Sequence, residues 1–115
     1  MQEVTRGTVF FDGVVIGRFE TSNAEMRDVW GRLNETREFE SSACRALLER
    51  LQRLTEYLDS CGDDANPTIK KAELELEQLQ AQLEEHTFEY GPDGLGRGPI
   101  VILKWRRGWL EFRLL

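Results

Sequence analysis

Residues 41–86 read SSACRALLERLQRLTEYLDSCGDDANPTIKKAELELEQLQAQLEEH, and this stretch predicts two long amphipathic helices. Its apolar residues recur in steps of three and four, the spacing that places side chains on one face of an α-helix. The first stripe comprises Cys44, Leu47, Leu48, Leu51, Leu54, Leu58 and Cys61, and the second comprises Ile69, Ala72, Leu76, Leu79, Leu83 and His86. Each predicted helix has about 20 residues and is therefore roughly 30 Å long.

The segment between the two stripes predicts a short turn. Gly62 is expected to end the first helix, because glycine readily adopts the left-handed conformation of a helix C-terminus. Asn66 before Pro67 predicts the start of the second helix, with an N-cap followed by proline at the first helical position. Helices of equal length joined by a short loop pack antiparallel, so we expect a helical hairpin.

The N-terminal region predicts a β-hairpin. Two β-rich runs, Thr8–Phe11 and Val14–Ile16, flank Asp12-Gly13. An Asp-Gly pair favours a type I′ turn, which needs a positive φ at both central positions. Both faces of this ribbon are apolar near the turn, so one face is expected to pack on the helices and the other against another element or another chain. The candidate residues for this self-association are Phe10, Phe11, Val14 and Val15.

The C-terminal third also predicts β structure. A short strand at Thr87–Tyr90 and a glycine-rich loop at Gly91–Pro99 precede strands at Ile100–Trp105 and Trp109–Leu114. The favoured connection of the last two strands is a three-residue loop, Arg106-Arg107-Gly108, which places Trp105 opposite Trp109. In the alternative, a two-residue loop at Arg107-Gly108 pairs Lys104 with Glu111.

Residues 22–40 have two interpretations. A helix capped by Ser22 or Asn23, with Met26, Val29, Trp30 and Leu33 on one face, is favoured, although Gly31 weakens it. The alternative is a strand pair, 29–33 and 36–40, that turns at Asn34-Glu35.

The expected fold class is α+β, with residues 1–115 as one domain. An antiparallel helical hairpin packs with an antiparallel sheet of four or five strands, made from the N-terminal hairpin and the C-terminal strands. Hydrophobic residues make up 40% of the chain, enough for a core. The chain carries no secretory signal and no apolar run of the roughly 20 residues that span a bilayer, so we expect a cytoplasmic protein without membrane contact.

The charge distribution favours partners other than bulk nucleic acid. The net charge is −6, whereas nucleic-acid binding uses an excess of Lys and Arg. Residues 63–90 hold eight acidic residues and two lysines, while residues 94–115 hold five basic residues and one acidic residue. Such asymmetry can orient a partner or a second copy.

Two patterns suggest chemistry, and both are better explained structurally. Cys44 and His86 should lie close across the helical hairpin, but a Cys-His dyad needs an orienting group that is not recognisable here. Gly91–Pro99 contains Gly-x-Gly but leads into a strand, not into the helix N-terminus of a phosphate-binding loop.

The two cysteines are about 25 Å apart along one helix, too far for a disulfide. We expect no cofactor and no metal.

The strongest candidate contact surface is the basic and aromatic C-terminal hairpin. Arginine and aromatic residues are over-represented at binding hot spots and can stack on bases. The candidate residues are Arg97, Lys104, Trp105, Arg106, Arg107 and Trp109. The predicted function is that of a small non-enzymatic binding or regulatory protein, adaptor-like or inhibitor-like, whose partner is another protein or a second copy. The alternative is nucleotide or nucleic-acid binding through the same hairpin, and an enzyme that uses Cys44 and His86 is less favoured.

Overall fold

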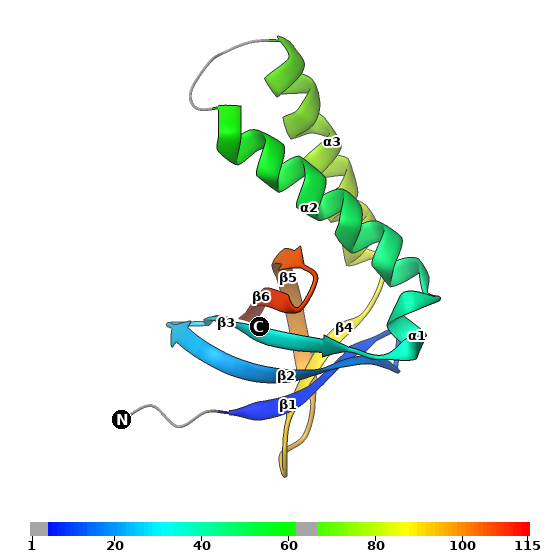
Figure 1. Ribbon diagram of the computed structural model, residues 1–115, viewed down its shortest axis with the longest axis vertical. Coiled ribbons are helices and arrows are strands. Elements are labelled where there is room, and N and C mark those ends of the chain that lie inside the picture. The colour runs from blue at the N-terminus through cyan, green and yellow to red at the C-terminus, as the bar shows by residue number, and fades with distance from the viewer. Residues whose placement is uncertain (1–4, 62–66) are drawn as a thin grey trace.

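The computed structural model describes residues 5–61 and 67–115, and their strands form a closed six-stranded antiparallel barrel (Figure 1). The order around the barrel is β1-β2-β3-β6-β5-β4, and β4 pairs back with β1. The strands are β1 (Arg6–Phe11), β2 (Val14–Glu25), β3 (Asp28–Glu35), β4 (Phe88–Pro92), β5 (Gly98–Arg106) and β6 (Trp109–Leu114). The helices are α1 (Arg37–Glu40), α2 (Ala43–Cys61) and α3 (Pro67–Glu84).

The expected fold class is wrong: the strands close into a six-stranded barrel, and the helical hairpin does not pack on an open sheet of four or five strands. β2 is twelve residues long, and β3 follows it after a turn at residues 26–27. β3 then pairs with β6, while β1 pairs with β4. With the pairing of β4 and β5, every strand therefore has two neighbouring strands over at least part of its length. The edges that an open sheet would expose are thus paired over most of their length.

The favoured helix in residues 22–40 is wrong, and of the alternative strand pair only the first strand, 29–33, is found, as part of β3. Residues 28–35 form a single strand, and Arg37–Glu40 form one helical turn, with Thr36 as its N-cap. The structure requires a glycine at position 31, because a Cβ there would lie 2.1 Å from the carbonyl oxygen of Glu20 on β2. The pairing register of β2 with β3 shifts between Thr21 and Asn23, a β-bulge opposite this glycine. The glycine that weakened the helical interpretation thus permits close contact between two strands.

The two predicted hairpin turns have different outcomes. At Asp12-Gly13 the φ angles are 50° and 83°, and Phe11 pairs with Val14, so the type I′ turn is confirmed. The favoured three-residue loop at the β5–β6 turn is wrong, because Arg106 pairs with Trp109. The alternative two-residue loop is found, with Lys104 opposite Glu111 and Gly108 at φ 80°.

The helical hairpin itself is confirmed. Arg50 on α2 donates to the amide oxygen of Gln82 on α3 at 3.1 Å, which fits antiparallel packing. The predicted caps at Gly62 and Asn66 lie outside the described residues. Figure 1 shows the hairpin projecting from one end of the barrel. Over the described residues, no helix is long and apolar enough to cross a membrane.

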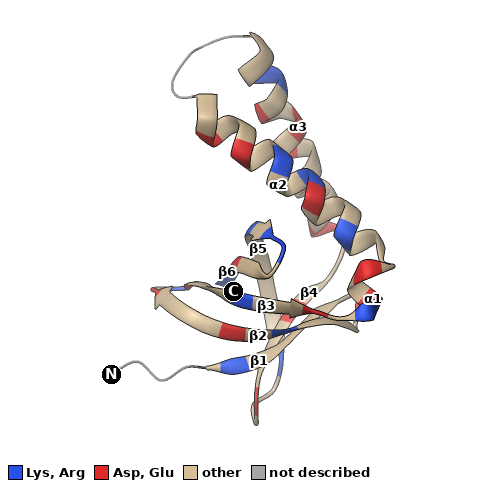
Figure 2. Ribbon diagram, viewed as in Figure 1, with Lys and Arg blue, Asp and Glu red and all other residues tan. Residues whose placement is uncertain are grey.

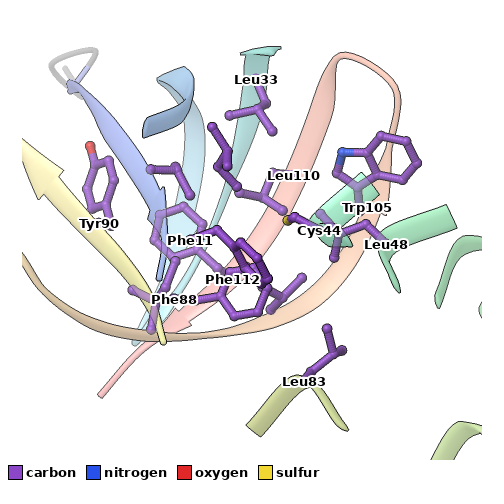
Figure 3. Close-up of a cluster of buried hydrophobic side chains, with 14 of the residues drawn as sticks. Phe11, Leu33, Cys44, Leu48, Leu83, Phe88, Tyr90, Trp105, Leu110 and Phe112 are labelled. Carbon is purple, nitrogen blue, oxygen red and sulfur yellow. The ribbon is translucent and has the colours of Figure 1, made fainter. Parts of the chain in front are cut away.

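The core fills the barrel and extends to its helical end. Val9, Phe19, Leu33, Leu110 and Phe112 are at most 1% exposed, and Figure 3 shows side chains of this cluster. Buried residues of α1 and α2 continue the cluster, namely Phe39, Cys44, Leu48 and Leu51. The apolar stripe of α2 therefore closes one end of the barrel, which gives the helical hairpin its anchor.

Candidate functional site: the groove between α3 and β5

The barrel wall has one weak junction, between β4 and β5. These strands pair at only two positions, Glu89 with Pro99 and Tyr90 with Gly98. Beyond that point β5 continues to Arg106, while the chain on the other side belongs to the end of α3. Residues 100–106 pair with β6 alone, except Leu103, which lies at a β-bulge between Ile102 and Lys104 and has no paired residue on β6. Within the described part of the chain, one edge of β5 therefore has no strand neighbour from Ile100 onward.

A groove of about 480 Å³ follows this free edge. Leu83, Phe88, Ile100 and Ile102 contribute buried apolar side chains to it. Val101 is 39% exposed and Leu115 is 68% exposed. The full lining is Gln80, Leu83, Glu84, His86, Thr87, Phe88, Pro99, Ile100, Val101, Ile102, Leu103 and Leu115. An apolar concave surface of this size is typical of a binding site.

One charged side chain at this groove has no ion-pair partner. Glu84 lies exposed near the end of α3 and takes part in no ion pair within residues 5–61 and 67–115. Lys104, just beyond the groove on β5, lies 3.7 Å from the carboxylate of Asp59 on α2. The free charge at the groove is therefore negative.

A hydrogen-bonded cluster fixes the corner where α3 joins β4. The carboxylate of Asp12 accepts from the backbone N–H of Thr87 at 2.7 Å and lies 2.7 Å from Nδ1 of His86. The backbone N–H of Asp12 donates to the carbonyl of Thr87 at 2.8 Å. The Thr87 N–H and then His86 lower the pKa of Asp12. Because His86 and Thr87 line the groove, this cluster helps to set its shape.

The predicted basic and aromatic surface is not a free patch. Trp105 is 3% exposed and packs on Phe39, with ring centroids 5.7 Å apart, so it belongs to the core. Arg107 donates to Glu40 at 2.6 Å, a contact that raises the pKa of Arg107. Arg106 lies over the ring of Trp109, 4.9 Å from its centroid. The side chains at this turn are therefore largely engaged within the chain.

Arg97 does not share a surface with these residues. It lies on the β4–β5 loop, 3.7 Å from Glu89 and 4.5 Å from the centroid of the Phe10 ring. Figure 2 shows both signs of charge along the two long helices. The structure thus does not gather the six predicted contact residues into one positive surface, and nucleic-acid binding loses its main structural argument.

The predicted self-association residues are divided between core and surface. Phe11 is 7% exposed and packs in the core. Phe10 is half-buried beneath Arg97. Val14 and Val15 are exposed, and they leave only a small apolar patch at the β1–β2 turn.

The Cys-His pair does not form a dyad. Cys44 is fully buried in the core, and burial, followed by the charge of Asp12, raises the pKa of its thiol to about 12. His86 is bound to Asp12 and its ring packs on Phe11 at 4.7 Å. Cys61 is free at the opposite end of α2. Among the described residues, no group of three His, Cys, Asp or Glu side chains could hold a metal ion.

Sequence reasoning did not find the groove, although one signal was present. Residues 100–103 are a continuous apolar run, Ile-Val-Ile-Leu, where a barrel strand with a solvated outer face would alternate with polar residues. Such a run indicates that both faces of the strand are partly covered. Comparison of the chain with protein-family models, with curated proteins and with solved structures finds no match.

Proposed function

We propose that this chain is a non-enzymatic binding or regulatory protein that holds a partner protein in the groove between α3 and β5. The observation that carries the proposal is the free edge of β5 beside apolar side chains that are partly exposed. Exposed apolar surface in a concave site is characteristic of protein contacts. The two free cysteines favour a reducing compartment, so we place this activity in the cytoplasm.

Self-association is part of the same proposal, because a second copy can use the remaining exposed apolar residues. Val14 and Val15 are the predicted residues that stay accessible. Light scattering at high protein concentration measures this directly: a dimer supports self-association, and a clean monomer contradicts it.

The binding proposal is tested by affinity capture from a lysate of the native host. Three baits are compared: the wild type, Val101→Glu in the groove, and Leu95→Glu as the matched control. Leu95 is 73% exposed and does not line the groove, so both variants place one carboxylate on the surface. We expect a protein that the wild type and Leu95→Glu retain and that Val101→Glu loses. Identical capture by all three baits contradicts the proposal.

A further inference from the structure

We infer that the groove between α3 and β5 binds an extended segment of a partner protein, which pairs with β5 as an additional strand and carries a Lys or Arg for Glu84. This inference rests on the proposed function and names the kind of partner. Its starting point is the free edge of β5, because an unpaired strand edge presents a row of backbone donors and acceptors. An extended peptide can satisfy these groups by strand addition.

The position of α2 limits the length of the added strand. The groove follows β5 from Pro99 to Leu103. At the next residue Lys104 contacts Asp59 of α2, and Trp105 is buried against the helical end of the barrel. Because Pro99 still pairs with Glu89, the accessible edge is about four residues, 100–103, or roughly 13 Å at the rise of a strand. A segment of about four extended residues fits this edge.

The side chains around the edge specify apolar residues at alternate positions of the segment. Successive side chains of a strand point to opposite faces, so every second residue of an added strand faces the same wall. On the protein side these walls are apolar: Leu83 and Phe88 come from the α3–β4 side, and Ile100 and Ile102 come from β5. Alternating apolar residues in the segment would cover these walls.

The charge of the groove selects a basic residue in the segment. Glu84 has no ion-pair partner among the described residues, and the whole chain carries a net charge of −6. Opposite charge steers a partner toward its site and suppresses partners of the wrong sign. In a second copy of this chain most basic side chains of residues 94–115 are held by carboxylates of their own chain, so we favour a basic segment of a different protein.

The test is selection of binders from a displayed library of random twelve-residue peptides, with the full chain as target and Val101→Glu as counter-target. We expect selected peptides with alternating apolar residues and at least one Lys or Arg. Their affinity should fall at least about tenfold in Val101→Glu, since a carboxylate would face an apolar contact. Glu84→Gln should weaken binding about fivefold and reduce its dependence on salt.

Strand addition is separated from other modes by the peptide backbone. Two versions of a selected peptide are compared, one with N-methyl groups at its odd positions and one with N-methyl groups at its even positions. Each version lacks the backbone donors along one edge, so we expect only one of the two versions to lose binding. Binding by both versions, or selected peptides with a helical apolar period or a negative charge, overturns the inference.

The proposed function and this inference can fail separately. If lysate capture depends on Val101 but no extended peptide binds the groove, the inference is wrong and the proposed function stands. If capture does not depend on Val101 and no peptide binds, both are wrong. A dimer in solution that Val101→Glu breaks and that peptides do not disrupt assigns the groove to a second copy and overturns the inference.

Discussion

Replacing Gly31 by alanine distinguishes the observed barrel from a helix over residues 22–40. In the barrel, the added Cβ would lie 2.1 Å from the carbonyl oxygen of Glu20 and 2.7 Å from the backbone nitrogen of Ser22. Ordinary carbon–oxygen contacts are about 3.3 Å or longer, so β2 and β3 would have to separate by about 1 Å. Both contacts are to backbone, which cannot rotate away as a side chain can.

The expected cost follows from this geometry. Forcing extra atoms into a well-packed site typically costs about 1–3 kcal/mol, and a clash with backbone belongs at the upper end of that range. In a helix the same substitution would instead stabilise the protein by about 1 kcal/mol, because glycine is a poor helix former. The two structures therefore predict changes of opposite sign in the free energy of unfolding.

Urea unfolding followed by tryptophan fluorescence measures this change. We expect Gly31→Ala to lower the free energy of unfolding by about 2–3 kcal/mol. The matched control is Gly96→Ala, where a Cβ meets nothing within 4 Å and φ is not positive, so a change within about 0.5 kcal/mol is expected. A Gly31→Ala protein as stable as the wild type, or more stable, would refute the pairing of β2 with β3.

Three further predictions concern single side chains. Asp12→Asn converts the Asp-Gly turn to Asn-Gly, which suits the same type I′ turn, but it removes the charge that Thr87 and His86 stabilise. Because the folded pKa of Asp12 is lowered, the wild type should be more stable than the variant above the unfolded pKa of about 3.9, by less than about 1 kcal/mol given the exposure of Asp12. Thermal unfolding should show this difference in stability vanish as pH falls through the folded pKa. In thiol titration with an aromatic disulfide, Cys61 should react in the native protein while Cys44, with its pKa near 12, reacts only on unfolding; equal rates would contradict the burial of Cys44. Tyr90→Phe should leave the free energy of unfolding within about 0.5 kcal/mol or raise it, since the buried Tyr90 hydroxyl makes no hydrogen bond of full geometry and interacts only weakly with Thr21. A loss above about 1 kcal/mol in urea unfolding would argue against this.

Local signals in the sequence predicted the helices and the first turn. The stripe through Cys44, Leu48 and Leu51 is a property of one helix, and these residues are buried as expected. The Asp12-Gly13 turn depends only on the φ angles that its own residues tolerate. Patterns of this kind are complete within a short window of sequence, which is why they could be read without the rest of the fold.

The barrel and the groove depend on contacts between residues far apart in sequence. Asp28 pairs with Arg113, and their side chains form an ion pair at 2.7 Å, yet neither residue suggests the other locally. In the sequence Gly31 argues against a helix, but its structural role depends on β2, a strand that the local pattern around Gly31 does not show. The groove arises where β5 diverges from β4 after Pro99. This divergence is a feature of the tertiary structure, and the run Ile-Val-Ile-Leu is only a weak indication of it.

Contacts between distant residues also explain why two of the predicted contact residues do not offer a free surface. Residue type alone identified Trp105 and Arg107 as candidates for a binding surface. Trp105 is buried, and Arg107 is held by Glu40 on α1, a partner 67 residues away in sequence. Composition therefore indicates only residue types that suit a contact surface, whereas burial and internal ion pairs decide which of these residues can meet a partner.

Amide hydrogen exchange along β5, resolved by NMR, tests the free edge most directly, because it needs only the protein itself. In the free protein, residues 100–102, which precede the β-bulge at Leu103, should alternate between slow exchange, where the N–H faces β6, and fast exchange, where it faces the groove. β1, which pairs with β2 and β4, should show no such alternation at Val9, Phe10 and Phe11. Uniform protection of residues 100–102 would contradict the free edge, and with it the proposed binding site.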